Sequence, residues 1–226
     1  MTRRFGDASA PELLEQVARA LVVKGITLGQ LDRQEEAVAV YAEVVRRFGG
    51  ASEPELLEQV AKALFNMGAA LGELDRKEAA VAVYEEVARR FGDASAPELL
   101  EQVAWALVDK GIALGDLDRP EEEITAYDEV VRRLGEASAP ALLAQVAWAL
   151  VNKGVALGQL DRPEEEMAVY DEVVRRFGDA AATALLGQVA RALDFKGITL
   201  RQLDRKEDAL SVYDEVVRRF GEASAT

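Results

Sequence analysis

Two tryptophans, Trp105 and Trp148, lie 43 residues apart and are the only two in a chain of 226 residues. At the same interval, the equivalent positions carry the cations Arg19, Lys62 and Arg191. Exposed tryptophan and arginine side chains are frequent anchors in protein interfaces, so this position predicts a binding surface. The alternative interpretation is that the tryptophans are half-buried packing residues between helices, and the sequence leaves both open.

The positions three and four residues further along also change character at this interval. Apolar, amide, acidic and aromatic side chains replace one another there. Residues three and four apart share one face of a helix, so each copy presents one small variable patch. We therefore predict a protein- or peptide-binding site formed by Arg19, Val23, Lys62, Phe65, Asn66, Trp105, Asp109, Trp148, Asn152, Arg191 and Phe195.

Cysteine and histidine are absent from the sequence. The chain therefore offers no thiolate nucleophile, no disulfide, and neither the commonest general base nor the commonest transition-metal ligand. The glycines lie inside helical patterns rather than after a strand, so they form no phosphate-binding loop. These features predict a protein that is not an enzyme and that uses no cofactor and no metal.

Two kinds of charge run have a plain structural interpretation. The runs 121–123 and 164–166 each contain three glutamates in the first turn of a predicted helix, where the helix dipole favours negative charge. We expect solvated carboxylates there rather than a cation site. The repeated Arg46-Arg47 pair lies at a predicted helix C-terminus, where positive charge is favoured. Neither kind of run is assigned to a functional site.

The stretch from Leu21 to Phe48 recurs four more times at a shift of 43 residues. A fixed period of this length is the signature of a stacked array of repeats. Because every copy carries the same apolar pattern, we predict a single domain over residues 1–226. Its repeat units are approximately 6–48, 49–91, 92–134, 135–177 and 178–220.

Each repeat is predicted to contain two antiparallel helices. The first begins at the Ser-Ala-Pro-Glu pattern of Ser9, interpreted as a capping box, and is roughly twenty residues long. The second begins near Asp32, ends before Gly49 and carries the apolar stripe Ala37, Tyr41, Val44 and Phe48. The predicted fold class is all-α: an α-solenoid, which is a superhelical array of five helix-turn-helix repeats.

Gly25 and its four equivalents lie inside the first helix of every repeat. An interior glycine costs about 1 kcal/mol relative to alanine, so its recurrence predicts a packing constraint. We expect close approach of the second helix, whose Ala37 is small enough to match. In the third and fourth repeats Glu123 and Glu166 occupy this alanine position, and close approach does not account for them.

The core pattern of the first repeat consists of Ala20, Leu21, Gly25, Leu28, Leu31, Arg33, Glu35, Glu36, Ala37 and Tyr41. This pattern resembles the two-helix signature of the tetratricopeptide repeat family. The 43-residue period exceeds the family's usual period of about 34, which implies a variant with a longer first helix, and Asp32 stands where the family usually has glycine. HEAT or armadillo repeats, with periods of about 40–47 residues, are the alternative.

The resemblance implies a protein-interaction scaffold whose first helices line a concave groove for peptide segments. Asn66 and Asn152 match an asparagine that many members use to hold a peptide backbone or a terminal carboxylate. The aromatic anchors and their neighbouring cations favour a ligand with a hydrophobic centre and acidic flanks. The alternative function is a structural array that associates end to end through faces such as that of Leu210 and Val217.

The chain has a net charge of −14 at pH 7. Such a charge repels nucleic acid and anionic lipid, so we expect neither nucleic acid nor membrane among its partners. The sequence is also expected to contain no signal peptide and no apolar run long enough to cross a bilayer. A cytoplasmic location is the resulting prediction.

Overall fold

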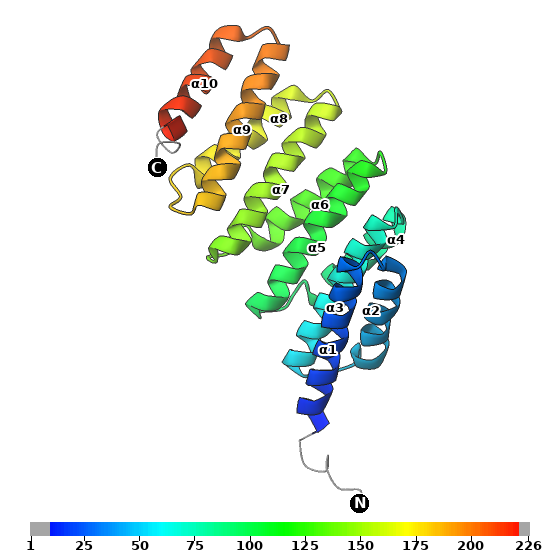
Figure 1. Ribbon diagram of the computed structural model, residues 1–226. Helices are drawn as coiled ribbons and strands as arrows, with labels where there is room; N and C mark the ends of the chain where they lie inside the picture. The colour runs from blue at the N-terminus through cyan, green and yellow to red at the C-terminus, as the bar shows by residue number, and fades with distance from the viewer. Residues whose placement is uncertain (1–9, 222–226) are drawn as a thin grey trace, which may run out of the picture. The chain divides into compact units, whose positions relative to one another are not determined.

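The computed structural model describes residues 10–221, and this part of the chain consists of ten helices without a strand (Figure 1). The first helix of each repeat has 20 or 21 residues and the second has 15. Equivalent helices start 43 residues apart, at Pro54, Pro97 and Pro140 for example. The all-helical, helix-turn-helix fold class is confirmed. The helices are α1 (Ala10–Gln30), α2 (Gln34–Phe48), α3 (Pro54–Glu73), α4 (Lys77–Phe91), α5 (Pro97–Asp116), α6 (Pro120–Leu134), α7 (Pro140–Gln159), α8 (Pro163–Phe177), α9 (Thr183–Gln202) and α10 (Lys206–Phe220).

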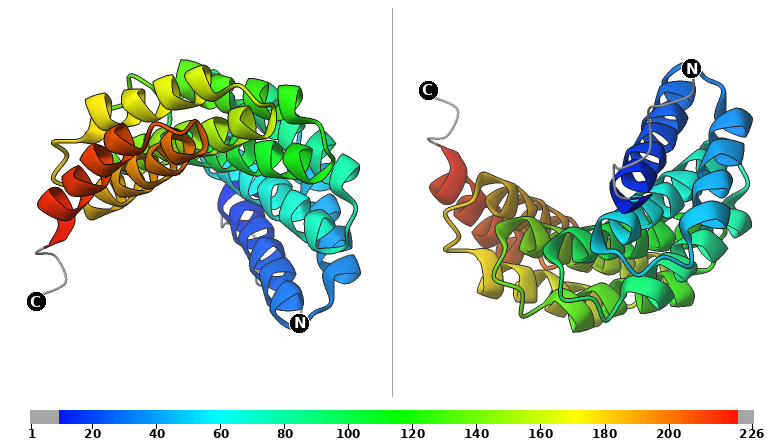
Figure 2. Two further views of the ribbon diagram at one scale, coloured as in Figure 1. Left: turned by 90° about the horizontal axis from the view of Figure 1, so that it is seen from above. Right: turned by 90° about the horizontal axis from the view of Figure 1, so that it is seen from below.

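The chain divides into two compact units, Met1–Leu117 and Asp118–Thr226, here called unit 1 and unit 2. In unit 1 each helix packs against the next, and the first helices α1, α3 and α5 also pack side by side (Figures 1 and 2). Unit 2 repeats this arrangement with α6 to α10, in which α7 packs against α9. A single solenoid over residues 1–226 stays a prediction.

The first helices begin differently from the predicted capping boxes. The residue before α3, α5, α7 and α9 is extended and makes no side-chain cap hydrogen bond. In α3, α5 and α7 that residue precedes a proline, and the proline ring forces its predecessor out of the helical region. Ser52, for example, therefore lies one residue outside the cap position, which Glu53 takes. The predicted cap at Ser9 lies outside the described residues.

The turn between the two helices of a repeat contains an aspartate with positive φ. Asp32, Asp75, Asp118, Asp161 and Asp204 have φ between 55° and 58°. This left-handed region favours glycine, and aspartate is one of the few other residues that enter it at modest cost. The departure from the family's usual glycine is thus accommodated locally. The predicted cap position is wrong, because the residue after the aspartate is the N-cap and it makes no side-chain cap hydrogen bond.

The predicted apolar stripe of the second helix is confirmed in α2, where Ala37, Tyr41, Val44 and Phe48 are buried. The predicted packing constraint from the second helix is confirmed at the interior glycines, but the residue that imposes it is the tyrosine and not the alanine. A Cβ atom on Gly25 would lie 2.3 Å from Cε1 of the Tyr41 ring. The equivalent distances are 2.4 Å for Gly68, 2.3 Å for Gly154 and 2.5 Å for Gly197. The glycine therefore makes room for the tyrosine ring rather than for the alanine.

The paired arginines at the ends of the second helices have two roles. In α2, α4 and α6 the first arginine of the pair is exposed and bonds to its own helix, as Arg46 does to Glu43. The second reaches the preceding repeat: Arg176 Nη2 donates to the Gly135 carbonyl at 2.7 Å. In unit 1 the same contact, from Arg90 Nη1 to the Gly49 carbonyl, is longer at 3.5 Å. The pair is structural, as expected, but the second arginine also links adjacent repeats.

Helix α7 qualifies as a membrane span by length and composition alone, with a mean hydropathy of 1.3. This result contradicts the expectation that no apolar run is long enough. Half of the window is buried inside the protein, and α7 packs against α6, α8 and α9. Its apolar side chains therefore have partners within unit 2.

Candidate functional site

Three small notches lie at equivalent places on the faces of the first helices, each lined by the recurrent tyrosine. Their volumes are about 270, 300 and 270 Å³. The α1–α3 notch is lined by Ile26, Gly29, Gln30, Gln34, Tyr41, Asn66, Ala69, Ala70 and Glu73. The α3–α5 notch is lined by Ala69, Gly72, Glu73, Lys77, Ala80, Tyr84, Asp109, Ile112, Ala113 and Asp116. The α7–α9 notch is lined by Val155, Gly158, Gln159, Glu166, Tyr170, Phe195, Ile198, Thr199 and Gln202.

The α1–α3 notch contains an amide and a carboxylate in contact. Gln34 Nε2 donates to Glu73 and to the Gly29 carbonyl, the latter at 3.3 Å. Burial, and then the charge of Glu73, raises the pKa of Tyr41 to about 12. The Asn66 amide at its edge donates to the Lys62 carbonyl at 2.7 Å, one turn earlier in α3. This notch is polar, and its groups are engaged with one another.

The α3–α5 notch holds a half-buried carboxylate beside the tyrosine. Burial raises the pKa of Asp109 to about 6, and the hydrogen bond with Tyr84 opposes part of that rise. The pKa of Tyr84 is raised by burial and by the charge of Asp109. Lys77 lies at the rim, 3.2 Å from Asp116 and 3.5 Å from Asp75. The notch therefore carries a carboxyl group that titrates close to neutral pH.

The α7–α9 notch holds a carboxylate that comes from the other wall. Glu166 is only 8% exposed and accepts a hydrogen bond from Thr199 Oγ1 at 2.7 Å. The Tyr170 ring is stacked on Phe195 with centroids 6.0 Å apart. Its buried hydroxyl has no partner in hydrogen-bonding geometry, yet burial and the nearby Glu166 raise its pKa.

The expectation of solvated carboxylates in both glutamate runs is wrong at their third members. Glu123 and Glu166 are buried, and the Tyr127 hydroxyl donates to Glu123 at 3.1 Å. The reason is helical geometry: the fourth residue of the helix faces the core, at the position where α2 has Ala37. The replacement of alanine by glutamate was the sequence signal for this feature. Thr199, which stands where α3 has Ala70, was a second signal that sequence reasoning missed.

The two tryptophans differ in their surroundings. Trp105 is 45% exposed, and its ring centroid lies 6.4 Å from that of Phe65. Trp148 is half-buried, with its ring edge-on to Tyr127 at 6.3 Å. Neither ring is fully buried. Full burial would have ruled out the hypothesis that the tryptophans are binding anchors. Their role in binding stays a prediction.

The remaining predicted site residues fall into two groups. Asn66, Asp109 and Phe195 each line one notch. The others lie on the first helices without lining a notch, and several are engaged locally. Lys62 forms an ion pair with Glu58, and Asn152 donates a hydrogen bond to the Trp148 carbonyl at 2.8 Å. The Arg191 guanidinium lies 5.9 Å from the Phe195 ring centroid. Arg19 and Val23 are exposed on α1.

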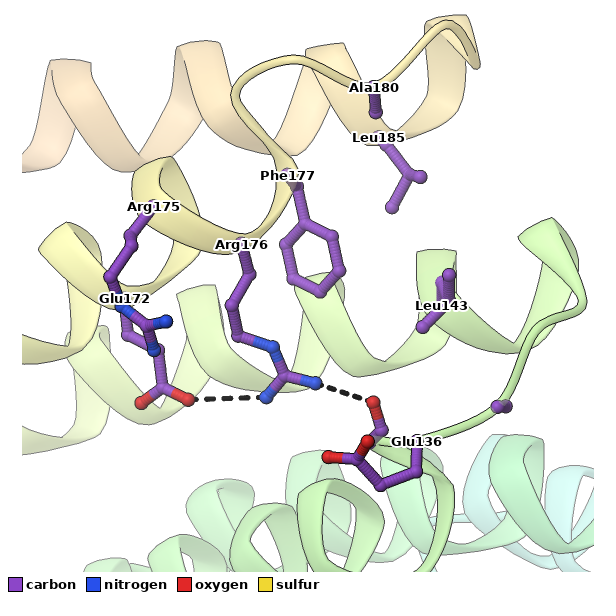
Figure 3. Close-up of a pocket in the computed structure, with 10 residues that line it drawn as sticks. Glu136, Leu143, Glu172, Arg175, Arg176, Phe177, Ala180 and Leu185 are labelled. Carbon is purple, nitrogen blue, oxygen red and sulfur yellow. Dashed lines mark hydrogen bonds and ion pairs between the residues drawn. The ribbon is translucent and has the colours of Figure 1, made fainter.

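A larger groove of about 580 Å³ lies at the loop edge of unit 2 (Figure 3). Arg176 points into it and bonds to Glu172 at 3.2 Å and to the Gly135 carbonyl at 2.7 Å (Figure 3). Its apolar wall comes from Phe177, Leu143 and Leu185, which face one another. Because its most buried cation is already paired, this groove is a junction between repeats rather than the candidate site. Across residues 10–221, no cluster of three acidic residues has the arrangement of a metal site.

Comparison with known proteins matches one segment of the chain to a repeat family. A tetratricopeptide repeat family model matches residues 62–94, which run from α3 to just beyond α4. A search of curated protein sequences gave no significant match. Residues 62–94 are thus similar to a tetratricopeptide repeat, as the resemblance implied.

Solved structures of low sequence identity share the fold. BtubC (BKLC) from P. vanneervenii is 15% identical, with a TM-score of 0.71 over 96% of this chain and 85% of that chain. The TPR-like repeats of a putative kinesin light chain from Podosopora anserina are 11% identical, with a TM-score of 0.66 over 94% and 99%. PlcR of Bacillus thuringiensis, solved in complex with the peptide PapR7 and DNA, is 13% identical, with a TM-score of 0.56 over 92% and 71%.

Proposed function

We propose that this protein is an interaction scaffold that holds a peptide segment of a partner protein against its first helices. The observation that carries the proposal is the recurrence of the notches. In unit 1 the α1–α3 and α3–α5 notches occupy equivalent places in adjacent repeats. Equivalent small pockets on a rigid helical face suit successive side chains of one extended segment, and a preorganised face loses little affinity to ordering.

Two further observations support this function. Tetratricopeptide-like repeats generally mediate protein or peptide interactions, and the structurally similar PlcR was solved with a bound peptide. Trp105, exposed beside Phe65, offers an aromatic anchor. Phe65 in turn lies beside Tyr84 of the α3–α5 notch, with ring centroids 6.2 Å apart. The absence of enzymatic activity and a cytoplasmic location belong to this proposal.

The test is selection of binding peptides from a displayed random library, with the whole chain as bait. The double variant Trp105→Ala, Trp148→Ala is expected to weaken the selected peptides about tenfold or more, because truncating a buried aromatic anchor has effects of that size. The matched control is Arg46→Ala, Arg47→Ala, which alters charges that bond within α2. Failure to enrich any peptide, or a larger loss in the control, would contradict the proposal.

A second candidate function is self-association, favoured by one observation on α10. Leu210 and Val217 are 56% and 69% exposed, whereas the equivalent Val81 and Ala88 in α4 are both 7% exposed. In α4 these positions belong to the helix that packs against α5. The occupant of the α10 face would be a first helix of a second copy, such as α1, whose Val17 is also exposed.

Sedimentation velocity over a wide concentration range tests self-association. The expected result is concentration-dependent assembly that Leu210→Lys abolishes, because burying an unpaired cation in such a contact is unfavourable. Lys206→Glu, on the same helix but already exposed, is the matched control. A monomer at all concentrations would remove this candidate.

A further inference from the structure

The α7–α9 notch differs from the other two in having a buried carboxylate that comes from a second helix, α8. Glu166 stands where α2 and α4 have the buried alanines Ala37 and Ala80. Its Oε2 atom lies 3.0 Å from the position that a Cβ atom on Gly158 would take, so the glycine leaves the space that the carboxylate uses. The carboxylate is therefore built into the notch between α7 and α9.

Within the described residues, no cation of the chain forms an ion pair with Glu166. The nearby cations are engaged elsewhere: Lys196 pairs with Asp171, and Lys153 pairs with Asp128. Arg191 lies over Phe195 and bonds to Gln188. Buried carboxylates are normally paired, because removing a charge from water is costly. The notch lacks that compensation within unit 2.

A second polar group in the notch also has unused capacity. The Tyr170 side chain is fully buried, and its hydroxyl lacks a partner in hydrogen-bonding geometry. The hydroxyl itself is out of reach of a ligand. Thr199 donates to one oxygen of Glu166, which leaves the carboxylate's other oxygen as an acceptor for a ligand that carries only donors.

The walls of the notch define the rest of the ligand. Phe195, Val155 and Ile198 are apolar and flank the carboxylate. An aliphatic stem packs well on such a surface while its charged end reaches the carboxylate. The volume of about 270 Å³ lies below the range of roughly 300–1,000 Å³ for pockets that hold whole small ligands. It fits one side chain.

We propose that the α7–α9 notch binds a lysine side chain of the partner segment, with the ammonium held by Glu166. This inference rests on the proposed peptide-binding function and names one side chain that the bound segment must carry. The sequence predicted a ligand with acidic flanks, and the inference replaces the flank at this notch with a basic residue. The reason is that the notch itself contains the carboxylate of Glu166, while Arg191 contacts Phe195 and Gln188. Because one carboxylate oxygen is already bonded to Thr199, a compact ammonium suits the other oxygen better than the planar guanidinium of arginine, which favours two parallel hydrogen bonds.

The test uses N-acetyl-lysine methylamide as the probe, followed by amide chemical shifts of the full chain. N-acetyl-norleucine methylamide, which keeps the aliphatic stem and lacks the amine, is the matched ligand control. We expect saturable shifts in α7, α8 and α9 with the lysine probe and at least tenfold weaker binding of norleucine. A charge-assisted hydrogen bond accounts for a difference of that size.

Two variants locate the effect. Glu166→Gln keeps the shape of the side chain and is expected to reduce lysine binding at least tenfold. Glu164→Gln, an exposed glutamate in the same helix turn, is expected to leave it unchanged. Thermal melting confirms that both variants fold. Equal binding of lysine and norleucine, or unchanged lysine binding by Glu166→Gln, would overturn the inference. If library peptides bind while the lysine probe does not, this inference fails and the proposed function stands.

Discussion

The α3–α5 notch of unit 1 and the α7–α9 notch of unit 2 place a carboxylate beside a buried tyrosine from opposite walls. In unit 1 the carboxylate is Asp109 on a first helix, and it lies in the same notch as Tyr84. In unit 2 it is Glu166 on a second helix, and it bonds to Thr199. The tyrosine is thus the constant part of the notch, and the acidic group is placed independently in each. A repeat scaffold can change its binding chemistry at one position without moving the ring that shapes the pocket.

The contact between the interior glycine and the tyrosine ring, which both notches share, predicts the largest effect. Gly68→Ala and Gly154→Ala should each lower the free energy of unfolding by about 3 kcal/mol, because the added methyl group would overlap a buried tyrosine ring. Urea denaturation of the two variants measures this loss. Similar losses in both units would confirm that the glycine–tyrosine contact is the common element.

The chain offers a matched control one turn away in the same helix. A Cβ atom on Gly72 would meet nothing within 4 Å, so Gly72→Ala should raise the stability by up to about 1 kcal/mol through helix propensity. If Gly68→Ala were also neutral or stabilising, the close contact with Tyr84 would not be the constraint that keeps glycine there.

The carboxylate, which is placed differently in the two notches, predicts an effect of pH on stability in unit 1. The pKa of Asp109 is raised from 3.8 to about 6 in the folded protein, so the folded state holds this proton more tightly than the unfolded state. The contribution of protonated Asp109 to the free energy of unfolding is therefore complete below about pH 4 and is lost as the pH rises through about 6. Asp109→Asn should therefore be more stable than the parent by about 2 kcal/mol at pH 7 and equal to it near pH 4. Denaturation curves across this pH range measure the difference.

The equivalent residue of the preceding repeat provides the reciprocal test. Asn66 occupies the Asp109 position in α3 and lines the α1–α3 notch. In the Asn66→Asp variant the free energy of unfolding should fall as the pH rises from about 4 to about 7, as Asp109 causes it to fall in the parent protein. A pH-independent difference for either variant would show that burial of the carboxylate is not its cause.

The contacts between repeats predict a smaller difference. Arg176 reaches the Gly135 carbonyl at 2.7 Å, and Arg90 reaches the Gly49 carbonyl at 3.5 Å. Arg176→Ala should cost about 1 kcal/mol, and Arg90→Ala clearly less, because the longer contact is a weak hydrogen bond. Thermal denaturation of both variants decides the order, and a larger loss for Arg90→Ala would reverse the comparison.

The smallest effect is expected at the turn between the first and second helix of a repeat, which has the same conformation beside both notches. Asp75 and Asp161 have φ of 56° and 55°. Replacement of either by alanine should lower the stability by about 0.5 kcal/mol, because alanine enters the left-handed region less readily than aspartate. Replacement by glycine should be nearly neutral, since relief of the backbone strain is offset by greater freedom of the unfolded chain. A stabilising alanine variant would contradict this account.

The helices could be predicted from the sequence because their signals are local. The spacing of Ala37, Tyr41, Val44 and Phe48 gave the buried face of α2 directly. The cap positions of α3, α5 and α7 failed because a proline ring overrode the serine signal, and both belong to the same four residues. Local pattern therefore predicts which segments are helical better than it predicts where they start.

The candidate site could be predicted only in part, because it depends on contacts between helices. The variable positions of the first helices pointed to Asp109 and Phe195, which do line notches. The burial of Glu166 could not be read from a run of three glutamates, which by itself indicates a solvated helix start. Its partner Thr199 lies 33 residues away, and only the packing of α8 against α9 brings the two together.

The order in which the helices pack also bears on how fast the protein folds. Within each unit, the contacting helices are neighbours or next neighbours along the chain, as α3 is to α4 and α5. Little loop-closure entropy is then lost before a contact forms, and chains with such local contacts fold in microseconds to milliseconds. Each helix pair can also form and open with its neighbours rather than with the whole chain. A segment that occupied the α1–α3 and α3–α5 notches together would slow the opening of α3, the helix that both share.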